Sequence, residues 1–483
     1  MTGYNTTQNR MIAGRAIISA LALWLAFSGM AAGEQLYVNE SGWWWEGGAF
    51  NVSSAPIQAA VDAAGEGDSI YVEGGNYYEN VDVNKPRLTL EGEGADVVTV
   101  TAADTGDPVF EVADVNYVNI SGFAVRGVTD DDMTGVYLDN ANYCNISGNN
   151  IYGNHRGIQL SFSSNNALTN NNVNSNTEHG IHMGWSSNNA LTENTASNNE
   201  YGIYLWHSSN NNNLTNNNAS NNWNGIHLTF SCNNNHLTNN IASNNWYSID
   251  LYSSSNNTLT NNTASNNEQG IYLWHSSNNN NLTSNTANSN DDHGIYLHNA
   301  DNNNLTSNTA NSNGYYGIYL SNADSNDITC NWVQKNTQHG FYISGGSTSN
   351  TIEHNNIIEN GNYNTTSGGW EWQFYMGQYQ PVEAKHNYWG AGMNNSTIDA
   401  SIYDDDEGWG EVEFYPFETD PVPCTPTPDE SSTFTTADAV IALQIAVGSR
   451  PFDSRYDVSG DGKVTSLDAL MILQAAAWRV EIG

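Results

Sequence analysis

The chain has 483 residues and a formal net charge of −39, with 51 acidic residues against 12 lysines and arginines. Such an acidic surface repels nucleic acid and anionic lipid, so the composition excludes both as partners. The length allows two or three ordinary domains or one long repeat array.

Residues 1–33 show the three parts of a secretory signal peptide. Arg10 and Arg15 precede an apolar run at residues 16–27, and small residues follow it. An uncleaved membrane anchor is the alternative, but the run is short for a bilayer span. We therefore expect cleavage near residues 31–33, a secreted or cell-surface location, and no membrane span in the mature chain.

One unit of 22–24 residues recurs along residues 111–420. Its apolar residues alternate with period two, as in a half-buried strand. Short strands repeated at the length of one coil predict a mainly β fold, a parallel β-helix in which each coil buries its apolar face against the next. The G-[IV]-x-[LM] motif, or its variants SIDL and GFYI, begins at Gly135, Gly157, Gly180, Gly202, Gly225, Ser248, Gly270, Gly294, Gly317 and Gly340.

Asparagine occupies two fixed columns of this repeat, which run from Asn149 to Asn355 and from Asn154 to Asn360. Inward-facing asparagines can pass amide hydrogen bonds from coil to coil, so we expect two buried ladders instead of a disordered Asn-rich tract. Coils lie ~4.8 Å apart, which separates neighbouring cysteines of the array by roughly 19 Å. Three cysteines are therefore expected to be free: Cys144, Cys232 and Cys330.

The flanking segments make a family resemblance specific. Residues 56–94 read as a short helix followed by a strand, a turn and another strand, within an N-terminal cap and first coils at 34–110; HNYWGAG at 386–392 closes the array. With the coil motifs, these segments resemble pectin-lyase-like proteins, most closely the NosD-type branch with CASH-domain (carbohydrate-binding and sugar-hydrolase) repeats. The resemblance covers residues 34–420 and implies a right-handed β-helix solenoid.

The resemblance also implies two kinds of chemistry that must be checked against the residues: copper binding and pectate-lyase catalysis. NosD-type proteins are linked to copper-site maturation, but His182 and His227 lie two coils apart, so they do not predict a copper site. A pectate-lyase mechanism requires an acidic calcium-binding cluster and an arginine or lysine as catalytic base. The coils offer almost only Arg156 and Lys335 as such a base.

A second module follows a Pro-rich linker at 421–433. Residues 434–483 contain two helix-like segments related by an offset of 30 residues, and an EF-hand-type loop precedes the second one. Oxygen ligands at its positions 1, 3, 5, 7, 9 and 12 predict Ca²⁺ binding. The duplication resembles dockerin domains, which are small all-α modules, and implies a cohesin-like module as partner. The predicted ligands are Asp457, Ser459, Asp461, the Lys463 carbonyl, Thr465 and Asp468.

An outward column of the coils is rich in aromatic residues. Aromatic faces stack on sugar rings and tyrosine hydroxyls add polar contacts, so this column predicts a polysaccharide or surface glycan as ligand. The alternative is that aromatics simply suit exposed β positions and stack on one another. The candidate carbohydrate-binding residues are Tyr204, Trp206, His227, Tyr252, Tyr272, Trp274, Tyr296, Tyr319 and Tyr342.

Two pairs of carboxylates on adjacent coils are candidate catalytic residues, namely Glu178 with Glu200 and Glu268 with Asp292. Their backbones should lie about 5 Å apart, near the carboxyl separation of a retaining glycosidase. An acidic protein also produces such neighbours by chance. Three functions stay open: a glycan-binding protein docked through its calcium module, an enzyme of the same fold (glycoside hydrolase, lyase or epimerase), and a structural surface rod.

Overall fold

A computed structural model of the chain describes residues 33–423 except residue 367, together with residues 443, 446, 463–466 and 469. The chain divides into two compact units, residues 1–423 and 424–483. Nearly all of the predicted signal peptide, linker and dockerin-like module lie outside the described residues. Within these residues, no helix is both long and apolar enough to cross a membrane.

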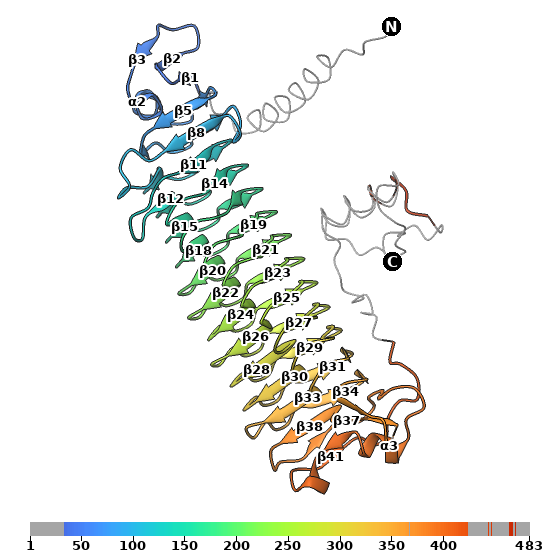
Figure 1. Ribbon diagram of the computed structural model, residues 1–483. Helices are drawn as coiled ribbons and strands as arrows, with labels where there is room; N and C mark the ends of the chain where they lie inside the picture. Colours follow the sequence, from blue (N-terminus) through green and yellow to red (C-terminus); the bar gives the residue numbers. More distant parts are fainter. Residues whose placement is uncertain are drawn as a thin grey trace. The chain divides into compact units, whose positions relative to one another are not determined.

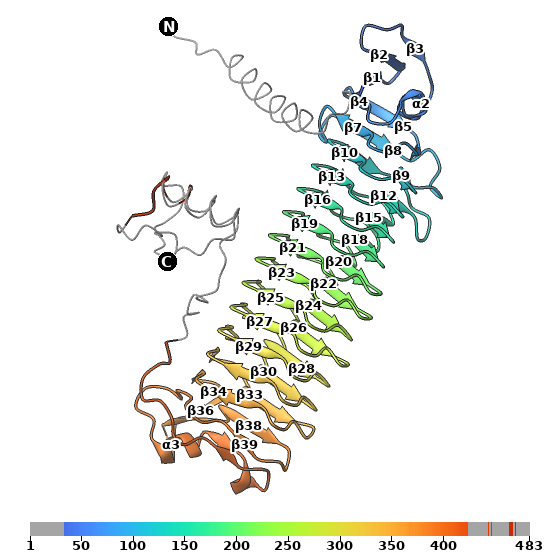
Figure 2. The same cartoon turned by 180° about the vertical axis from the view of Figure 1, so that it is seen from behind.

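The first unit is a stack of coils whose strands form three sheets along the stack, which are parallel except at β1 to β3 (Figures 1 and 2). The first sheet has sixteen strands: β1 (Gln35–Asn39), β2 (Gly42–Trp45), β3 (Asn51–Val52), β4 (Ser69–Val72), β7 (Thr89–Gly92), β10 (Asn119–Ser121), β13 (Asn145–Ser147), β16 (Ala167–Thr169), β19 (Ala190–Thr192), β21 (Asn213–Thr215), β23 (His236–Thr238), β25 (Thr258–Thr260), β27 (Asn281–Thr283), β29 (Asn304–Thr306), β31 (Asp327–Thr329) and β34 (Thr351–Glu353).

The second sheet, which carries the G-[IV]-x-[LM] motifs, has fourteen strands. They are β6 (Val81–Val83), β9 (Phe110–Ala113), β12 (Thr134–Asp139), β15 (Arg156–Ser161), β18 (His179–Gly184), β20 (Tyr201–Trp206), β22 (Asn224–Thr229), β24 (Tyr247–Tyr252), β26 (Gln269–Trp274), β28 (Ile295–His298), β30 (Tyr316–Ser321), β33 (His339–Ser344), β38 (Phe374–Gly377) and β40 (Ile402–Tyr403).

The third sheet is the narrowest and continues along the stack as single bridges from Thr195 to Thr309. Its strands are β5 (Gly75–Tyr78), β8 (Val98–Thr101), β11 (Ala124–Arg126), β14 (Asn150–Ile151) and β17 (Asn172–Val173), followed after the bridges by β32 (Trp332–Gln334) and β35 (Asn356–Ile358). The remaining elements are α2 (Pro56–Ala63), α3 (Asn395–Asp399), a 3₁₀ turn (Asp405–Glu407), β36 (Asn362–Asn364), β37 (Gly369–Glu371), β39 (Val382–Glu383) and β41 (Val412–Glu413).

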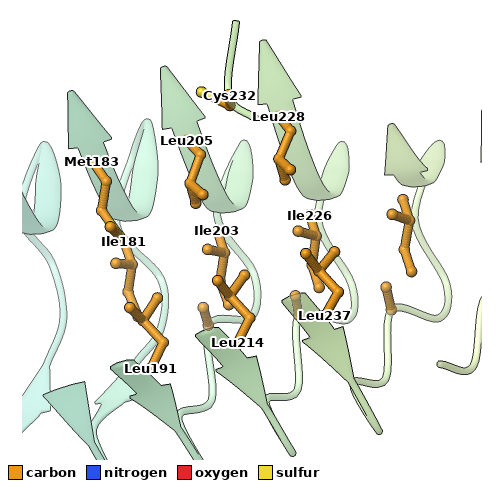
Figure 3. Packing of buried hydrophobic residues seen from close by; sticks show 14 of the residues in the cluster. Ile181, Met183, Leu191, Ile203, Leu205, Leu214, Ile226, Leu228, Cys232 and Leu237 are labelled. Atoms are coloured by element: carbon orange, nitrogen blue, oxygen red, sulfur yellow. The ribbon is translucent and has the colours of Figure 1, made fainter. Parts of the chain in front are cut away.

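The core is a set of apolar columns in exact register between coils. Leu191 pairs with Leu214 and Leu214 with Leu237 on the first sheet, and all three are fully buried. Ile203 and Ile226 pair in the same way on the second sheet, and their side chains meet those of the first sheet between the two layers (Figure 3). The period-two alternation of the sequence therefore predicts the buried face correctly.

The two expected asparagine ladders are present and buried. In the first, Asn240 donates from Nδ2 to Oδ1 of Asn262 at 3.0 Å and to the Leu214 carbonyl at 2.8 Å. A third ladder, from Asn166 to Asn350, repeats the pattern; Asn212 Nδ2, for example, lies 3.1 Å from Asn235 Oδ1. Its asparagines are the first residue of the N-x-[LI]-[ST] motif, so the sequence carried the signal for this ladder as well.

Asparagine has a second structural role in the turns. Many turn residues have left-handed backbone conformations, among them Asn216, Asn239 and Asn261 with φ of 54° to 56°. Asparagine adopts this conformation at lower cost than most residues that carry a side chain. The Asn-rich composition therefore comes from both the ladders and the turns.

The two ends of the stack differ from the coils. At the N-terminal end, strands β1 to β3 pair antiparallel and α2 buries Ile57 and Val61. The predicted short helix is thus confirmed at Pro56–Ala63. At the other end, Trp389 of the NYWG motif is buried in the core. Cys144, Cys232 and Cys330 are free thiols as predicted, whereas Cys424 lies outside the described residues.

Candidate functional site

The predicted carbohydrate-binding residues all lie on the second sheet, on strands β20 to β33, and they are half-buried. Two residues of the same column are more deeply buried than a solvent-facing column predicts, namely His182 at 8% exposure and Asp250 at 3%. The reason is that neighbouring aromatic rings cover them. His182 lies 5.2 Å from Tyr204 between ring centroids.

The tyrosines of this column stack on one another along the coils. Tyr296 has a parallel ring on each side, with Tyr272 at 4.7 Å and 5° and Tyr319 at 4.3 Å and 6°. Tyr319 stacks in turn on Tyr342 at 4.8 Å. The ring faces are therefore occupied by neighbouring rings, and this tyrosine ladder offers a ligand its edges and hydroxyls. Burial raises the pKa of Tyr272 and Tyr296, so these hydroxyls stay protonated.

Trp206 breaks this parallel order. Its ring stands at 75° to that of Trp185, with centroids 4.6 Å apart, and at 65° to that of His207 at 4.0 Å. Trp206 therefore packs at steep angles to both rings instead of parallel to them. An indole face is the surface on which a pyranose ring stacks.

Trp206 lies at a groove of about 570 Å³ on coils β12 to β20. The groove is lined with aromatic and polar side chains in similar measure, which is the usual make-up of a site for a polar organic ligand. The lining includes Arg156, Glu178, His182, Trp185, Glu200 and Tyr204.

One cation and several carboxylates set the charge of the groove. Arg156 donates from Nε to Glu178 at 2.6 Å and from Nη2 to Asp132 at 2.5 Å. Burial alone would raise the pKa of Glu178, but His179 and Arg156 outweigh it and hold that pKa well below its usual range. Glu200 adds a further carboxylate, so the groove as a whole is negative.

Two buried histidines form the floor beside these charges. His182 has no hydrogen-bond partner on either ring nitrogen, and its ring lies 4.8 Å from that of His179. Burial, together with the nearby His179 and Arg156, lowers the pKa of His182 to about 3. His182 is therefore neutral, and its two buried ring nitrogens are unpaired in the structure.

The two candidate carboxylate pairs have different surroundings. Glu178 and Glu200 line the same groove. Glu268 and Asp292 do not line it; burial and mutual repulsion raise the pKa of Glu268, while Asp292 accepts a hydrogen bond from Gln269. The catalytic role of either pair stays a prediction.

A buried aspartate and a half-buried histidine on adjacent coils form a pair that the sequence did not reveal. Asp250 Oδ2 lies 2.6 Å from Nδ1 of His227, and Oδ1 accepts a hydrogen bond from Trp274 Nε1 at 2.7 Å. No hydrogen bond is found for His227 Nε2, and this atom is not among the buried unpaired atoms of the described residues. It is therefore not fully buried.

A second aromatic ladder lies on the turn that follows the second sheet. Its rings stack at 5.0 to 5.1 Å, and their backbones are left-handed, with φ between 41° and 56°. Bulky residues disfavour this conformation, whereas the other coils place Asn, Ser or Gly there, except for His275. Counting five residues on from each repeat glycine would have revealed this column. The ladder consists of Phe162, Trp185, His207 and Phe230.

The predicted calcium loop cannot be described as a site. Asp457, Ser459, Asp461 and Asp468 lie outside the described residues, and Lys463 and Thr465 are described only as single residues. The predicted Ca²⁺ ligands and the dockerin-like fold therefore stay predictions from the sequence.

Comparison with known proteins agrees with the observed architecture. A family model described as "Right handed beta helix region" matches residues 134–287, and one described as "Periplasmic copper-binding protein (NosD)" matches residues 231–393. The fold is a right-handed parallel β-helix. This confirms the fold that the repeat and its resemblance predicted.

Individual relatives cover only parts of the chain. A cell surface glycoprotein of Methanothermus fervidus is 33% identical over 97 residues, which is 20% of this chain and 15% of that protein. Among solved structures, the A-module of a mannuronan C-5 epimerase of Azotobacter vinelandii is 16% identical, covers 63% of this chain and 89% of its own, and has a TM-score of 0.46. The catalytic unit of an α-1,3-glucanase of Streptomyces thermodiastaticus is 14% identical, with coverages of 61% and 65% and a TM-score of 0.47.

Proposed function

We propose that this β-helix binds a polysaccharide in the groove on coils β12 to β20. The observation that carries the proposal is that the Trp206 indole lines this groove beside Tyr204 and Trp185. A pyranose stacked on this indole would bring its hydroxyls within reach of Tyr204, His182 and Glu200, which line the same groove.

The charge of the groove favours a neutral glycan. Arg156 is already paired with Glu178 and Asp132, and Glu200 is left as a further negative charge. The chain as a whole carries −39. A polyuronate would therefore meet repulsion both at the groove and over the whole surface, whereas a neutral hydroxyl-rich chain would not.

Binding to a set of polysaccharides tests the proposal. The full-length chain is incubated with neutral glucans, mannans and xylans and, separately, with pectate and alginate, and depletion from solution is measured. We expect binding to at least one neutral polymer and weakening by roughly tenfold in Trp206→Ala, as expected for the loss of one stacking platform.

The matched control is Trp223→Ala. Trp223 is exposed and stacks on Trp246, away from the groove lining. If Trp223→Ala weakens binding as much as Trp206→Ala, the groove is not the site. If the parent chain binds no polymer in either class, the glycan proposal fails and the structural surface rod is the better description.

A polysaccharide-modifying enzyme is the second candidate, and the His227–Asp250 pair is the observation that favours it. A carboxylate on Nδ1 orients the imidazole so that Nε2 can take or give a proton. Release of reducing ends or of unsaturated product from a bound polymer would establish activity. Its loss in His227→Gln or Glu200→Gln, with binding retained, would assign the residue.

For location and attachment, we propose export by the N-terminal signal and docking through residues 434–483. Export is supported by the signal-peptide pattern at residues 1–33, and docking by the sequence motif of the calcium loop. Calorimetric titration of the full chain with Ca²⁺ is expected to give one site that Asp461→Ala removes. Ca²⁺-dependent capture of a cohesin-like module, abolished by EDTA, would identify the partner, whereas Ca²⁺ binding unchanged in Asp461→Ala would refute the loop.

A further inference from the structure

Near the C-terminal end of the coil array, two histidines and a glutamate gather outside the groove. Their ligand atoms, one from each of His354, His386 and Glu418, all lie within 4.8 Å of one another. They form the one such group of three His, Cys, Asp or Glu side chains in the part of the chain that the structure describes. We propose that these three residues bind a divalent transition-metal ion, Zn²⁺ or Cu²⁺.

The coil register holds the two imidazoles in place. His354 and His386 directly precede Asn355 and Asn387, which are consecutive members of the first asparagine ladder, with Asn355 Nδ2 3.1 Å from Asn387 Oδ1. The two histidines share the same left-handed turn conformation, with φ of 58° and 56°. Their rings consequently stack with an interplanar angle of 11° and centroids 5.4 Å apart.

The glutamate comes from the next coil. Glu418 pairs with Tyr388 across the third sheet, and its Oε1 lies 3.4 Å from Nδ1 of His386. Metal–ligand bonds of ~2.0–2.2 Å place two ligand atoms of a tetrahedral ion about 3.3–3.5 Å apart, so this pair already has the required separation. The other distances are at most 4.8 Å, so they need an approach of up to about 1.4 Å, which side chains of 42–50% exposure can make by rotation.

The donor set selects the class of metal. Two imidazole nitrogens and one carboxylate oxygen suit Zn²⁺ and Cu²⁺, whereas Ca²⁺ and Mg²⁺ require oxygen ligands. The equivalent turn position one coil before His354 holds Cys330, a free thiol that is partly exposed. In earlier coils this column holds Gly, Asn, Glu or Ser. Residue types that bind transition metals thus follow one another in this turn position only at Cys330, His354 and His386.

A bound ion would join three successive coils where the array ends. It would bridge the turn after β34 to the closing segments at residues 386 and 418, which few strand pairs hold. Binding to the folded state alone stabilises it in proportion to the occupancy of the site. We therefore expect Zn²⁺ or Cu²⁺ to raise the thermal unfolding midpoint of the chain through this site. Ca²⁺ should cause no rise through this site.

The test uses the full-length chain without a histidine tag, in 0.3 M NaCl with excess Ca²⁺ to suppress binding to the acidic surface. Titration calorimetry with ZnCl₂, and electron paramagnetic resonance with CuCl₂, are expected to report one site with nitrogen ligands. His386→Ala and Glu418→Gln should each lower the metal affinity by roughly tenfold or more. Loss of a residue that only hydrogen-bonds to a ligand already costs about that much affinity, and a direct ligand contributes at least as much. The rise in unfolding midpoint should disappear with them.

Two further variants make the test decisive. His236→Ala changes an exposed histidine far along the array and should leave both affinity and midpoint shift intact. Cys330→Ser reports whether the thiol is a fourth ligand, seen as loss of the sulfur charge-transfer band of the copper complex. The proposal is overturned if the parent chain binds neither ion at one site, or if His386→Ala and Glu418→Gln bind as tightly as the parent.

Discussion

The ring of Trp206 stands at 75° to the ring of Trp185, while Trp185 itself lies parallel to Phe162 at 7°. Parallel ring pairs and rings packed at steep angles therefore occur side by side at the groove. Tryptophan and tyrosine should contribute differently to binding, because an indole face stacks on a sugar ring whereas a tyrosine within a stack offers its hydroxyl for a hydrogen bond.

This difference predicts a dependence on ligand length. Tyr296→Phe keeps the stacking in the tyrosine ladder and removes only a hydroxyl, four coils or roughly 19 Å from Tyr204. We expect it to leave the affinity for a short oligosaccharide unchanged and to weaken binding of the long polymer severalfold. Calorimetry with both ligands measures this; an equal loss for the two would place the ligand elsewhere.

Removing one member of an asparagine ladder should destabilise the fold. Asn240 is fully buried, donates to Leu214 and Asn262, and accepts from the backbone and side-chain nitrogens of Asn217. Asn240→Ala would leave these groups unpaired in the core, which costs about 2–4 kcal/mol in the free energy of unfolding. Asn213→Ala, an exposed change on strand β21 of the preceding coil, is the control. Urea unfolding followed by circular dichroism compares them, and equal midpoints would mean that the ladder does not support the fold.

The repeat made most of the fold predictable. Fixed columns of Leu, Ile and Asn specify which side chains face inward in every coil, because one coil's register is copied by the next. The same logic predicted the free cysteines and the residues of the aromatic face.

The groove could not be predicted in the same way, because it depends on ring orientation. Trp206 and Trp274 hold equivalent places in the repeat, and each meets one neighbouring ring at a steep angle, 75° to Trp185 and 77° to Tyr252, but Trp274 also lies parallel to Tyr272 at 10°. The contact between His227 and Asp250 likewise depends on rotamers, which a column of letters does not contain. The second aromatic ladder, which begins at Phe162, has a regular spacing in the sequence, but its residues lie in the turn after the strand motif.

Acid should destabilise the chain through its buried histidines. Burial lowers the pKa of His339 to about 4, against about 6.5 in the unfolded chain. Between these values the unfolded chain binds a proton that the folded chain does not, so stability is fully present above pH ~6.5 and falls as the pH drops toward 4. His339→Phe preserves a ring between Tyr316 and Tyr375 and removes the titration.

Unfolding free energies of parent and His339→Phe at pH 7 and pH 4 measure this effect. The parent should lose about 2–3 kcal/mol more than the variant over this range. Asp404, whose pKa is raised by burial to about 6, acts in the opposite direction and is present in both chains, so it cancels in the comparison. A parent and variant with the same pH dependence would show that His339 is not kept neutral by burial.

The repeat glycine should be irreplaceable where the coils are closest. A Cβ on Gly202 would lie 2.6 Å from the Gly225 carbonyl oxygen and 2.6 Å from Asn222 Nδ2, a member of the second asparagine ladder. Because the backbone oxygen belongs to the next coil, neither group can move without breaking the register. Gly202→Ala should therefore cost about 2–3 kcal/mol in the free energy of unfolding. Gly184→Ala, whose Cβ would meet only the Trp206 ring at 3.4 Å, is the matched control on the neighbouring strand. If both variants unfold at the parent's urea midpoint, close packing does not explain the glycine column.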